Sequence, residues 1–143
     1  MPAALASHTL PVEAPLPPVH TPEVGRQVLA VFFRLTNEWH LGAADEQVLL
    51  GVGKTTLFAW KAGKVRAGLE PAVLERLSYL LRIYAALQIL LPEPERAAAW
   101  LRKPNAAPLF GGGTALQRLL AGQVGDLHAV ANYLDAQRGG DFA

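Results

Sequence analysis

The sequence predicts an all-α protein. Apolar residues recur at spacings of three and four along several segments, and no segment alternates apolar and polar residues for the length of a strand. Prolines and glycines separate these segments into pieces of helical length. The chain has 143 residues, of which 51% are hydrophobic and 17% charged, which is enough apolar material for a core. We expect an N-terminal helix-turn-helix bundle followed by a small C-terminal helical domain.

Residues 1–21 are predicted to form a flexible, proline-rich arm, because prolines recur there without any helical period. The first helix should begin at Thr21-Pro22-Glu23, which offers a capping hydroxyl, a proline at the first helical position and an acid near the positive end of the helix dipole. It should run to about His40. The apolar positions of its inner face are predicted to be Val24, Val28, Val31, Phe32, Leu35 and Trp39.

Two short helices should follow and form a helix-turn-helix. Ala43–Leu50 is the first, Gly51-Val52-Gly53 is a tight turn, and Lys54–Ala62 is the second. In the second helix, Leu57 and Trp60 should face inward, and Phe58 is a further candidate for that side. This order of helix, glycine turn and basic helix is typical of DNA-binding proteins.

Charge favours the same region as a DNA interface. The net charge is only +1, but residues 51–68 hold four basic residues and no acidic one. Hydroxyls and lysines at the start of a recognition helix can reach base edges and phosphates. The predicted DNA contacts are Lys54, Thr55, Thr56, Phe58 and Lys61, with Lys64 and Arg66 on phosphates. The alternative is a small helical bundle whose basic helix only faces solvent.

A nucleotide-binding loop is a weaker interpretation of the same residues. Gly51-Val52-Gly53-Lys54-Thr55 ends like a P-loop, but the glycine that the motif requires earlier is Val48 here. The motif also needs a preceding buried strand, whereas this region has helical character.

The C-terminal half should contain four more helices. The longest, from Pro71 to Leu91, has so wide an apolar face that it must be buried on two sides, and it is the candidate homodimer or interdomain surface. Pro94–Arg102 is the next. Thr114-Ala115-Leu116-Gln117 predicts a capping box and a short helix to Ala121. The last helix should run from about Gly125 to Arg138, with Leu127, Val130 and Leu134 facing inward.

Composition argues against several function classes. Cysteine is absent, and the histidines are scattered without the spacing of metal ligands. No serine, histidine and carboxylate set suggests catalysis, so we expect no cofactor and no enzyme. The apolar region Leu77–Leu91 is interrupted and too short for a bilayer, and the N-terminus has no signal-peptide pattern. We expect a soluble, cytoplasmic protein that does not bind membranes.

The C-terminal third carries the most specific pattern. Its elements are Trp100, Pro104-Asn105, Gly111–Gly113, Thr114-Ala115-Leu116, Gly122 and Arg138-Gly139. This pattern resembles the C-terminal domain of the Xre/MbcA/ParS antitoxin family, although many members have proline where this chain has Ala115, and a slightly shorter loop after the asparagine. The segment Thr55–Gly63 resembles the recognition helix of Xre-type repressors. The Tyr133–Gly140 ending resembles the branch that is paired with RES-domain toxins.

The resemblance implies a type II antitoxin with two functional parts. Residues 22–91 would bind operator DNA and form a homodimer, and residues 92–143 would bind the toxin. Such antitoxins neutralise a co-encoded RES-domain toxin, which degrades NAD⁺, by occluding its active site. The toxin-binding residues would be Tyr133, Arg138, Asp141, Phe142 and Ala143. The alternative is a stand-alone helix-turn-helix repressor or partition-type adaptor without an enzyme target.

Overall fold

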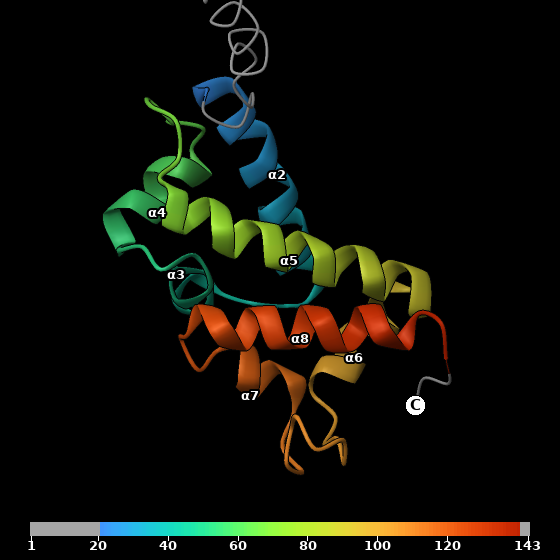
Figure 1. Ribbon diagram of the computed structural model, residues 1–143. Helices are drawn as coiled ribbons and strands as arrows, with labels where there is room; N and C mark the ends of the chain where they lie inside the picture. Colours follow the sequence, from blue (N-terminus) through green and yellow to red (C-terminus); the bar gives the residue numbers. More distant parts are fainter. Residues whose placement is uncertain (1–20, 141–143) are drawn as a thin grey trace, which may run out of the picture.

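The computed structural model describes residues 21–140 and consists of helices joined by short turns and loops (Figure 1). The helices are α2 (Pro22–Glu38), α3 (Ala43–Leu50), α4 (Lys54–Lys61), α5 (Pro71–Leu90), α6 (Pro94–Leu101), α7 (Ala115–Leu119) and α8 (Val124–Gln137). Within residues 21–140 the only β-type pairing is an isolated antiparallel bridge between Pro104 and Thr114. The predicted all-α fold is therefore confirmed.

Two helix starts follow the capping chemistry expected from the sequence. At α2, the Thr21 hydroxyl accepts a hydrogen bond from the Val24 amide at 3.2 Å, and Pro22 occupies the first helical position. At α7, Thr114 and Gln117 form both hydrogen bonds of a capping box, at 3.0 and 2.8 Å. Each cap satisfies a backbone N–H that the helix itself leaves unpaired.

The buried stripe of α2 is rotated from the predicted one. Leu29 is buried, whereas Val24, Val28 and Val31 are only half-buried. The fully inward positions are Gly25, Leu29, Phe32, Leu35 and Thr36. Phe32, Leu35 and Trp39 are buried as predicted, and Val28 and Val31 pack partly buried against the same core. The prediction missed Leu29 and Gly25, and Gly25 lies close to the side chains of Val65 and Leu69.

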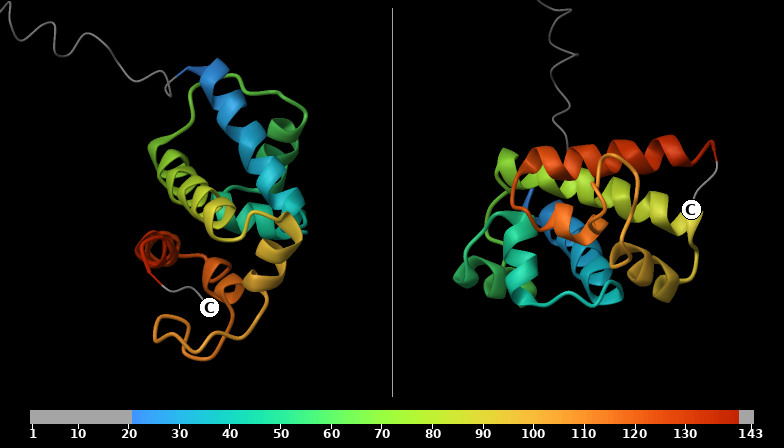
Figure 2. Two further views of the ribbon diagram at one scale, coloured as in Figure 1. Left: turned by 90° about the vertical axis from the view of Figure 1, so that its right-hand side faces the viewer. Right: turned by 90° about the horizontal axis from the view of Figure 1, so that it is seen from below.

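Helix α5 lies at the centre of the molecule, between α2 and α8 (Figure 2). Its contact with α8 is the most extensive between any two described helices. Tyr84 is 8% exposed and Ala86 is 0% exposed, and positions two residues apart lie on nearly opposite sides of a helix, so α5 is buried on more than one side, as its wide apolar face predicted. The interdomain interpretation of this surface agrees with the packing of α5 on α8, and the homodimer interpretation stays a prediction.

One hydrophobic cluster joins the two predicted parts of the chain. It contains Phe32 and Leu57 from the helix-turn-helix region and Leu119 and Leu134 from the C-terminal helices. Polar contacts reinforce this joint, because the Arg102 guanidinium of the α6 end donates to the Trp39 carbonyl oxygen at 2.5 Å. The two predicted parts therefore share one hydrophobic core, and the functional division after residue 91 stays a prediction.

Candidate functional site

Helix α4 is presented by two glycine turns at the edge of the molecule (Figure 1). Gly51 follows α3 with a φ of +69°, and Gly63 follows α4 with a φ of +81°. Side chains are strained in this left-handed region. At Gly51 there is a second constraint, because a β-carbon would lie 3.0 Å from Nε of Arg76. The turn between α3 and α4 is therefore tight and specific, as the sequence predicted.

All seven residues predicted to contact DNA have exposed side chains: Lys54, Thr55, Thr56, Phe58, Lys61, Lys64 and Arg66. On the inner side of α4, Leu57 is buried at 0% exposure and Trp60 is half-buried, as predicted. Phe58 is 46% exposed, so it does not share the inner side with them.

These residues divide between two sides of α4. Lys54, Thr55 and Phe58 occupy neighbouring positions on the outward side, which we call the recognition face. Thr56 and Arg66 instead line a cavity of about 350 Å³ whose wall includes Trp60. A nucleic acid that lies on the recognition face would therefore contact Lys54 and Phe58 together. Thr56 and Arg66 would contact a different part of the same nucleic acid.

Lys61 lies at the boundary of the recognition face and pairs with a buried acid. Its ammonium lies 2.6 Å from Oε1 of Glu46, whose side chain is only 4% exposed. The other carboxylate oxygen, Oε2, accepts a hydrogen bond from the Thr36 hydroxyl at 2.6 Å. The ammonium also lies 5.6 Å from the ring centroid of Phe58 and 5.7 Å from that of Phe33. One charged group thus connects α2, α3 and α4.

In the C-terminal half, Asn105 closes the glycine-rich loop. The backbone N–H of Asn105 donates to the backbone carbonyl of Gly113 at 2.8 Å, and the backbone N–H of Gly112 donates to the backbone carbonyl of Asn105 at 3.1 Å. The side-chain oxygen of Asn105 accepts a hydrogen bond from the backbone N–H of Ala107 at 2.9 Å. Gly111 and Gly112 have positive φ values of +57° and +87°. The asparagine and the glycines of the sequence pattern therefore form one structural clasp in front of α7.

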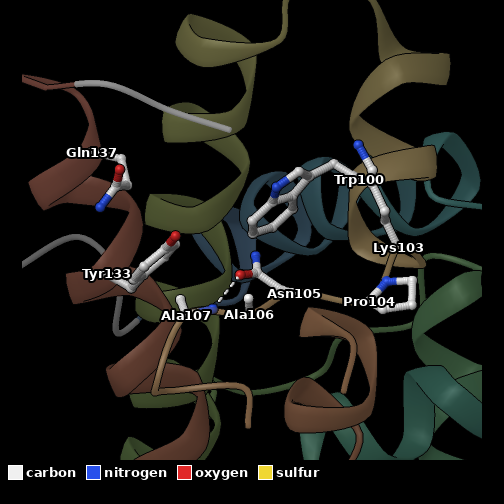
Figure 3. A pocket seen from close by; sticks show the side chains of 8 residues that line it. All are labelled: Trp100, Lys103, Pro104, Asn105, Ala106, Ala107, Tyr133 and Gln137. Atoms are coloured by element: carbon white, nitrogen blue, oxygen red, sulfur yellow. Dashed lines mark hydrogen bonds between the residues drawn. The ribbon is translucent and has the colours of Figure 1, made fainter. Parts of the chain in front are cut away.

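A cavity of about 320 Å³ lies between this clasp and α8 (Figure 3). Trp100 of α6 and Tyr133 of α8 flank it, and Asn105 lies at its floor. Tyr133 is half-buried, and its ring packs edge-on against Phe110 at a centroid distance of 5.2 Å. The predicted toxin contact at Tyr133 is therefore a partly buried ring whose open side faces a concave surface that also includes Lys103 and Gln137.

Arg138 follows the last helical residue of α8 and is exposed. Its guanidinium lies 3.9 Å from Oδ1 of Asp135, a long ion pair between groups that are 46% and 37% exposed. Gly139 and Gly140 are exposed as well. The remaining predicted toxin contacts, Asp141, Phe142 and Ala143, lie outside the described residues.

Comparison with known proteins assigns the C-terminal half. Residues 86–140 match the family model of the antitoxin Xre/MbcA/ParS C-terminal toxin-binding domain. A protein of Sinorhizobium fredii (strain NBRC 101917 / NGR234), "Uncharacterized protein y4oB", is 46% identical over 113 residues, which cover 78% of this chain and 84% of that protein.

The chain belongs to the Xre/MbcA/ParS antitoxin family. Its matched segment begins in the last turns of α5 and ends after α8, so it contains the clasp, the cavity and the exposed Arg138. The antitoxin therefore carries its toxin-binding domain on the side of the molecule formed by α6, α7 and α8. Tyr133 and Arg138 both lie within this domain.

Within residues 21–140 the antitoxin has no group of three or more histidine, aspartate or glutamate side chains placed to hold a metal ion. Among the helices in that range, none is long and apolar enough to cross a membrane.

Sequence reasoning missed Thr36 and Glu46. A signal for Glu46 was present, because Glu46, Leu49 and Leu50 have the spacing of one helical face and both leucines were expected to be buried. Thr36 carried the same kind of signal, because it follows the predicted inward Phe32 by four residues. Its pairing with Glu46 was not predictable, because Glu46 lies ten residues away on another helix.

Proposed function

We propose that this antitoxin neutralises a RES-domain toxin that degrades NAD⁺. In this proposal, the end of α8 and the residues after it occlude the active site of the toxin. The antitoxin also represses its own operon by binding promoter DNA through α4. The observation that supports toxin neutralisation most directly is the match to a toxin-binding domain that ends at an exposed, positively charged helix terminus.

The packing of α8 limits which of its residues can reach a toxin. Leu127, Val130 and Leu134 are all 0% exposed, because α8 lies along α5. Separating α8 from the body would expose these side chains at a cost of roughly 1.5–3 kcal/mol each. The toxin must therefore meet the outward side of α8, which presents the free edge of Tyr133, and the exposed end at Arg138.

Arg138 suits a role at an active site. A guanidinium forms paired hydrogen bonds with a carboxylate when it can approach at hydrogen-bond distance. At 3.9 Å, the ion pair with Asp135 is longer than such a contact and is exposed to water. Little is lost when Arg138 exchanges Asp135 for a carboxylate of the toxin.

Co-expression tests the toxin part of the proposal. The neighbouring gene product is expressed alone and with the antitoxin, while growth and cellular NAD⁺ are followed. We expect Arg138→Glu, and separately a chain that ends at Gly139, to lose protection, whereas Arg34→Glu on the exposed surface of α2 retains it. A chain that ends at Gln123 is a poor variant for this purpose, because it lacks α8 and hence part of the core.

The outcomes test the identity of the toxin and the way in which it is neutralised separately. Growth arrest without loss of NAD⁺ would contradict the RES assignment and leave the antitoxin role intact. Full protection by both tail variants would contradict occlusion by the end of α8.

Two observations support the proposal that the antitoxin binds its promoter: the basic side chains between positions 54 and 66 are exposed, and α3 and α4 are arranged as a helix-turn-helix. We expect the affinity of the antitoxin for its upstream DNA to fall steeply as salt rises, because counterions are released from neutralised phosphates. Binding that is insensitive to salt would contradict phosphate contacts by Lys54, Lys64 and Arg66.

A further inference from the structure

Phe58 is the one aromatic side chain on the recognition face of α4. Its side chain is 46% exposed, and its neighbours on that face are Lys54 and Thr55. A single exposed apolar residue normally needs no functional explanation. Here, however, the ring shares its face with one charge, that of Lys54, and one methyl group, that of Thr55, and the ring lies in contact with a lysine that is itself paired in the core.

Those contacts form a chain that starts in the core. Thr36 of α2, 1% exposed, donates to Glu46 of α3, and Glu46 pairs with Lys61 of α4 at 2.6 Å. The Lys61 ammonium lies 5.6 Å from the ring centroid of Phe58, within the range of a cation–π contact. The position of the exposed ring is thus linked to a buried carboxylate.

Lys61 cannot leave this position cheaply. If its ammonium moved to a DNA phosphate, the Glu46 carboxylate would stay buried at 4% exposure with only the Thr36 hydroxyl beside it. An uncompensated buried charge is among the most destabilising changes in a protein. Lys61 therefore acts on the recognition face through Phe58 and not as a phosphate contact.

We propose that Phe58 reads the 5-methyl group of a thymine in the major groove of the operator, and that Lys61 is the residue that positions it. Apolar side chains such as phenylalanine and the threonine methyl contact this group, which no other DNA base carries. Thr55 lies on the same face and adds a methyl of its own. The inference rests on the proposed promoter binding.

DNA fits this face better than a second copy of the chain does. Residues 51–68 contain four basic residues and no acidic one. In a symmetric dimer through this face, each basic residue would oppose the same surface of the partner, and like charges would repel. A phosphate backbone on either side of the major groove instead complements Lys54, Lys64 and Arg66.

The experiment uses the full antitoxin and a DNA fragment from upstream of its own coding sequence, amplified either with thymine or with uracil in place of thymine. Uracil has the same hydrogen-bonding groups but lacks the 5-methyl group. We expect the wild-type affinity to fall about fourfold for each methyl contact that is lost. Phe58→Ala should reduce the thymine preference by about fourfold and leave only what Thr55 contributes. Ile89→Ala, which removes an exposed apolar side chain of α5, should retain the wild-type thymine preference.

Lys61 variants test the positioning role separately. Lys61→Gln should reduce the thymine preference as Phe58→Ala does, while the slope of log affinity against log salt stays at the wild-type value. If Lys61 contacted a phosphate, Lys61→Gln would lose that contact, and the magnitude of the slope would fall by about 0.9. Lys61→Arg keeps a cation and should keep most of the thymine preference, and unfolding curves should show that each variant is folded at the assay temperature.

The results that overturn the inference are distinct from those that overturn promoter binding. Equal wild-type affinity for both fragments, an undiminished thymine preference in Phe58→Ala, or dissociation of a dimer by Phe58→Ala without loss of that preference contradicts the role of Phe58. A wild-type protein that binds neither fragment contradicts promoter binding itself and removes the basis of the inference.

Discussion

Helices α4 and α8 carry the two predicted interfaces, and they are built in different ways. In α4, only Leu57 is fully buried, so most of the helix is available to a partner. Four residues of α8 are buried along α5: Leu127, Val130, Ala131 and Leu134. Helix α4 is attached to the body by one side and exposes the rest, whereas α8 is part of the body and exposes only one side and its end.

The electrostatics of the two regions differ in the same way. The α4 region has a buried carboxylate, Glu46, whose pairing with Lys61 links α3 to α4. The ion pairs of the α8 region lie nearer the surface, as in Arg82 with Asp135 at 2.6 Å, where the two side chains are 40% and 37% exposed. Because exposed pairs contribute little, α8 is held mainly by apolar packing and by one partly buried pair, Arg118 with Asp126. Helix α4 combines the buried side chain of Leu57 with the pair between Lys61 and Glu46. The following predictions test that contrast.

The largest effect should come from the core face of α8. Leu134→Ala leaves a cavity beside α5 and should lower the free energy of unfolding by about 2–5 kcal/mol. Denaturant titration measures the loss. On α4, Phe58→Ala removes an exposed ring and should change the free energy of unfolding by less than about 0.5 kcal/mol. Equal losses in the two variants would contradict the contrast between the helices.

The next effect concerns the buried ion pair. Lys61→Met removes the cation and leaves the Glu46 carboxylate buried, which should cost about 1–3 kcal/mol, since Lys61 itself is partly solvated. Lys54→Met, at an exposed position on the same helix, serves as the control and should change stability by less than about 0.5 kcal/mol. Thermal unfolding of both variants beside the wild type measures the difference. A Lys61→Met variant as stable as the control would show that α4 does not depend on this pair.

Helix caps allow a comparison of matched changes in the two regions. Thr21→Ala removes the cap of α2, and Thr114→Ala removes one half of the capping box of α7. Each should cost about 1 kcal/mol. We expect the Thr114 variant also to weaken toxin binding, because α7 follows the clasp that borders the cavity, whereas the Thr21 variant should leave it unchanged. A pull-down of the toxin with each variant checks this, and equal toxin binding would place the clasp outside the interface.

The smallest effect is a pH dependence at the contact between α2 and α5. Burial raises the pKa of the Tyr84 phenol, and the hydrogen bond at 2.9 Å and the charge of Glu38 raise it further. The folded state therefore holds this proton more tightly than the unfolded state, whose tyrosine titrates near 10. The resulting stabilisation is complete below about pH 10 and is lost as the pH rises through the folded pKa. Tyr84→Phe should show a smaller fall in unfolding midpoint between pH 8 and 11 than the wild type, and identical falls would contradict the raised pKa.

The helices and the turns were predictable because their signals are local. The predicted Ala43–Leu50 coincides with α3, and the capping box at Thr114 and Gln117 is present. Both depend on residues within one or two turns of each other. The inward face of α8 was likewise predictable from the spacing of Leu127, Val130 and Leu134.

The rotation of α2 was not predictable in the same way. Val28 and Leu29 are apolar neighbours, and only the packed structure shows that Leu29 is 2% exposed while Val28 is partly buried against the core. The exposure of Phe58 was ambiguous for the same reason, because an aromatic residue beside the inner face of a short helix can lie on either side of its boundary.

The sequence by itself determined the all-α class, the helix limits to within about two residues, and the pattern that identifies the toxin-binding domain, because periodicity, capping and motif spacing are properties of neighbouring residues. Only the tertiary structure decided that Lys61 pairs with Glu46, that Tyr133 faces a cavity with Trp100, and that α8 is buried along α5. Those contacts join residues far apart in the chain, and the burial that selects them arises only when the helices pack.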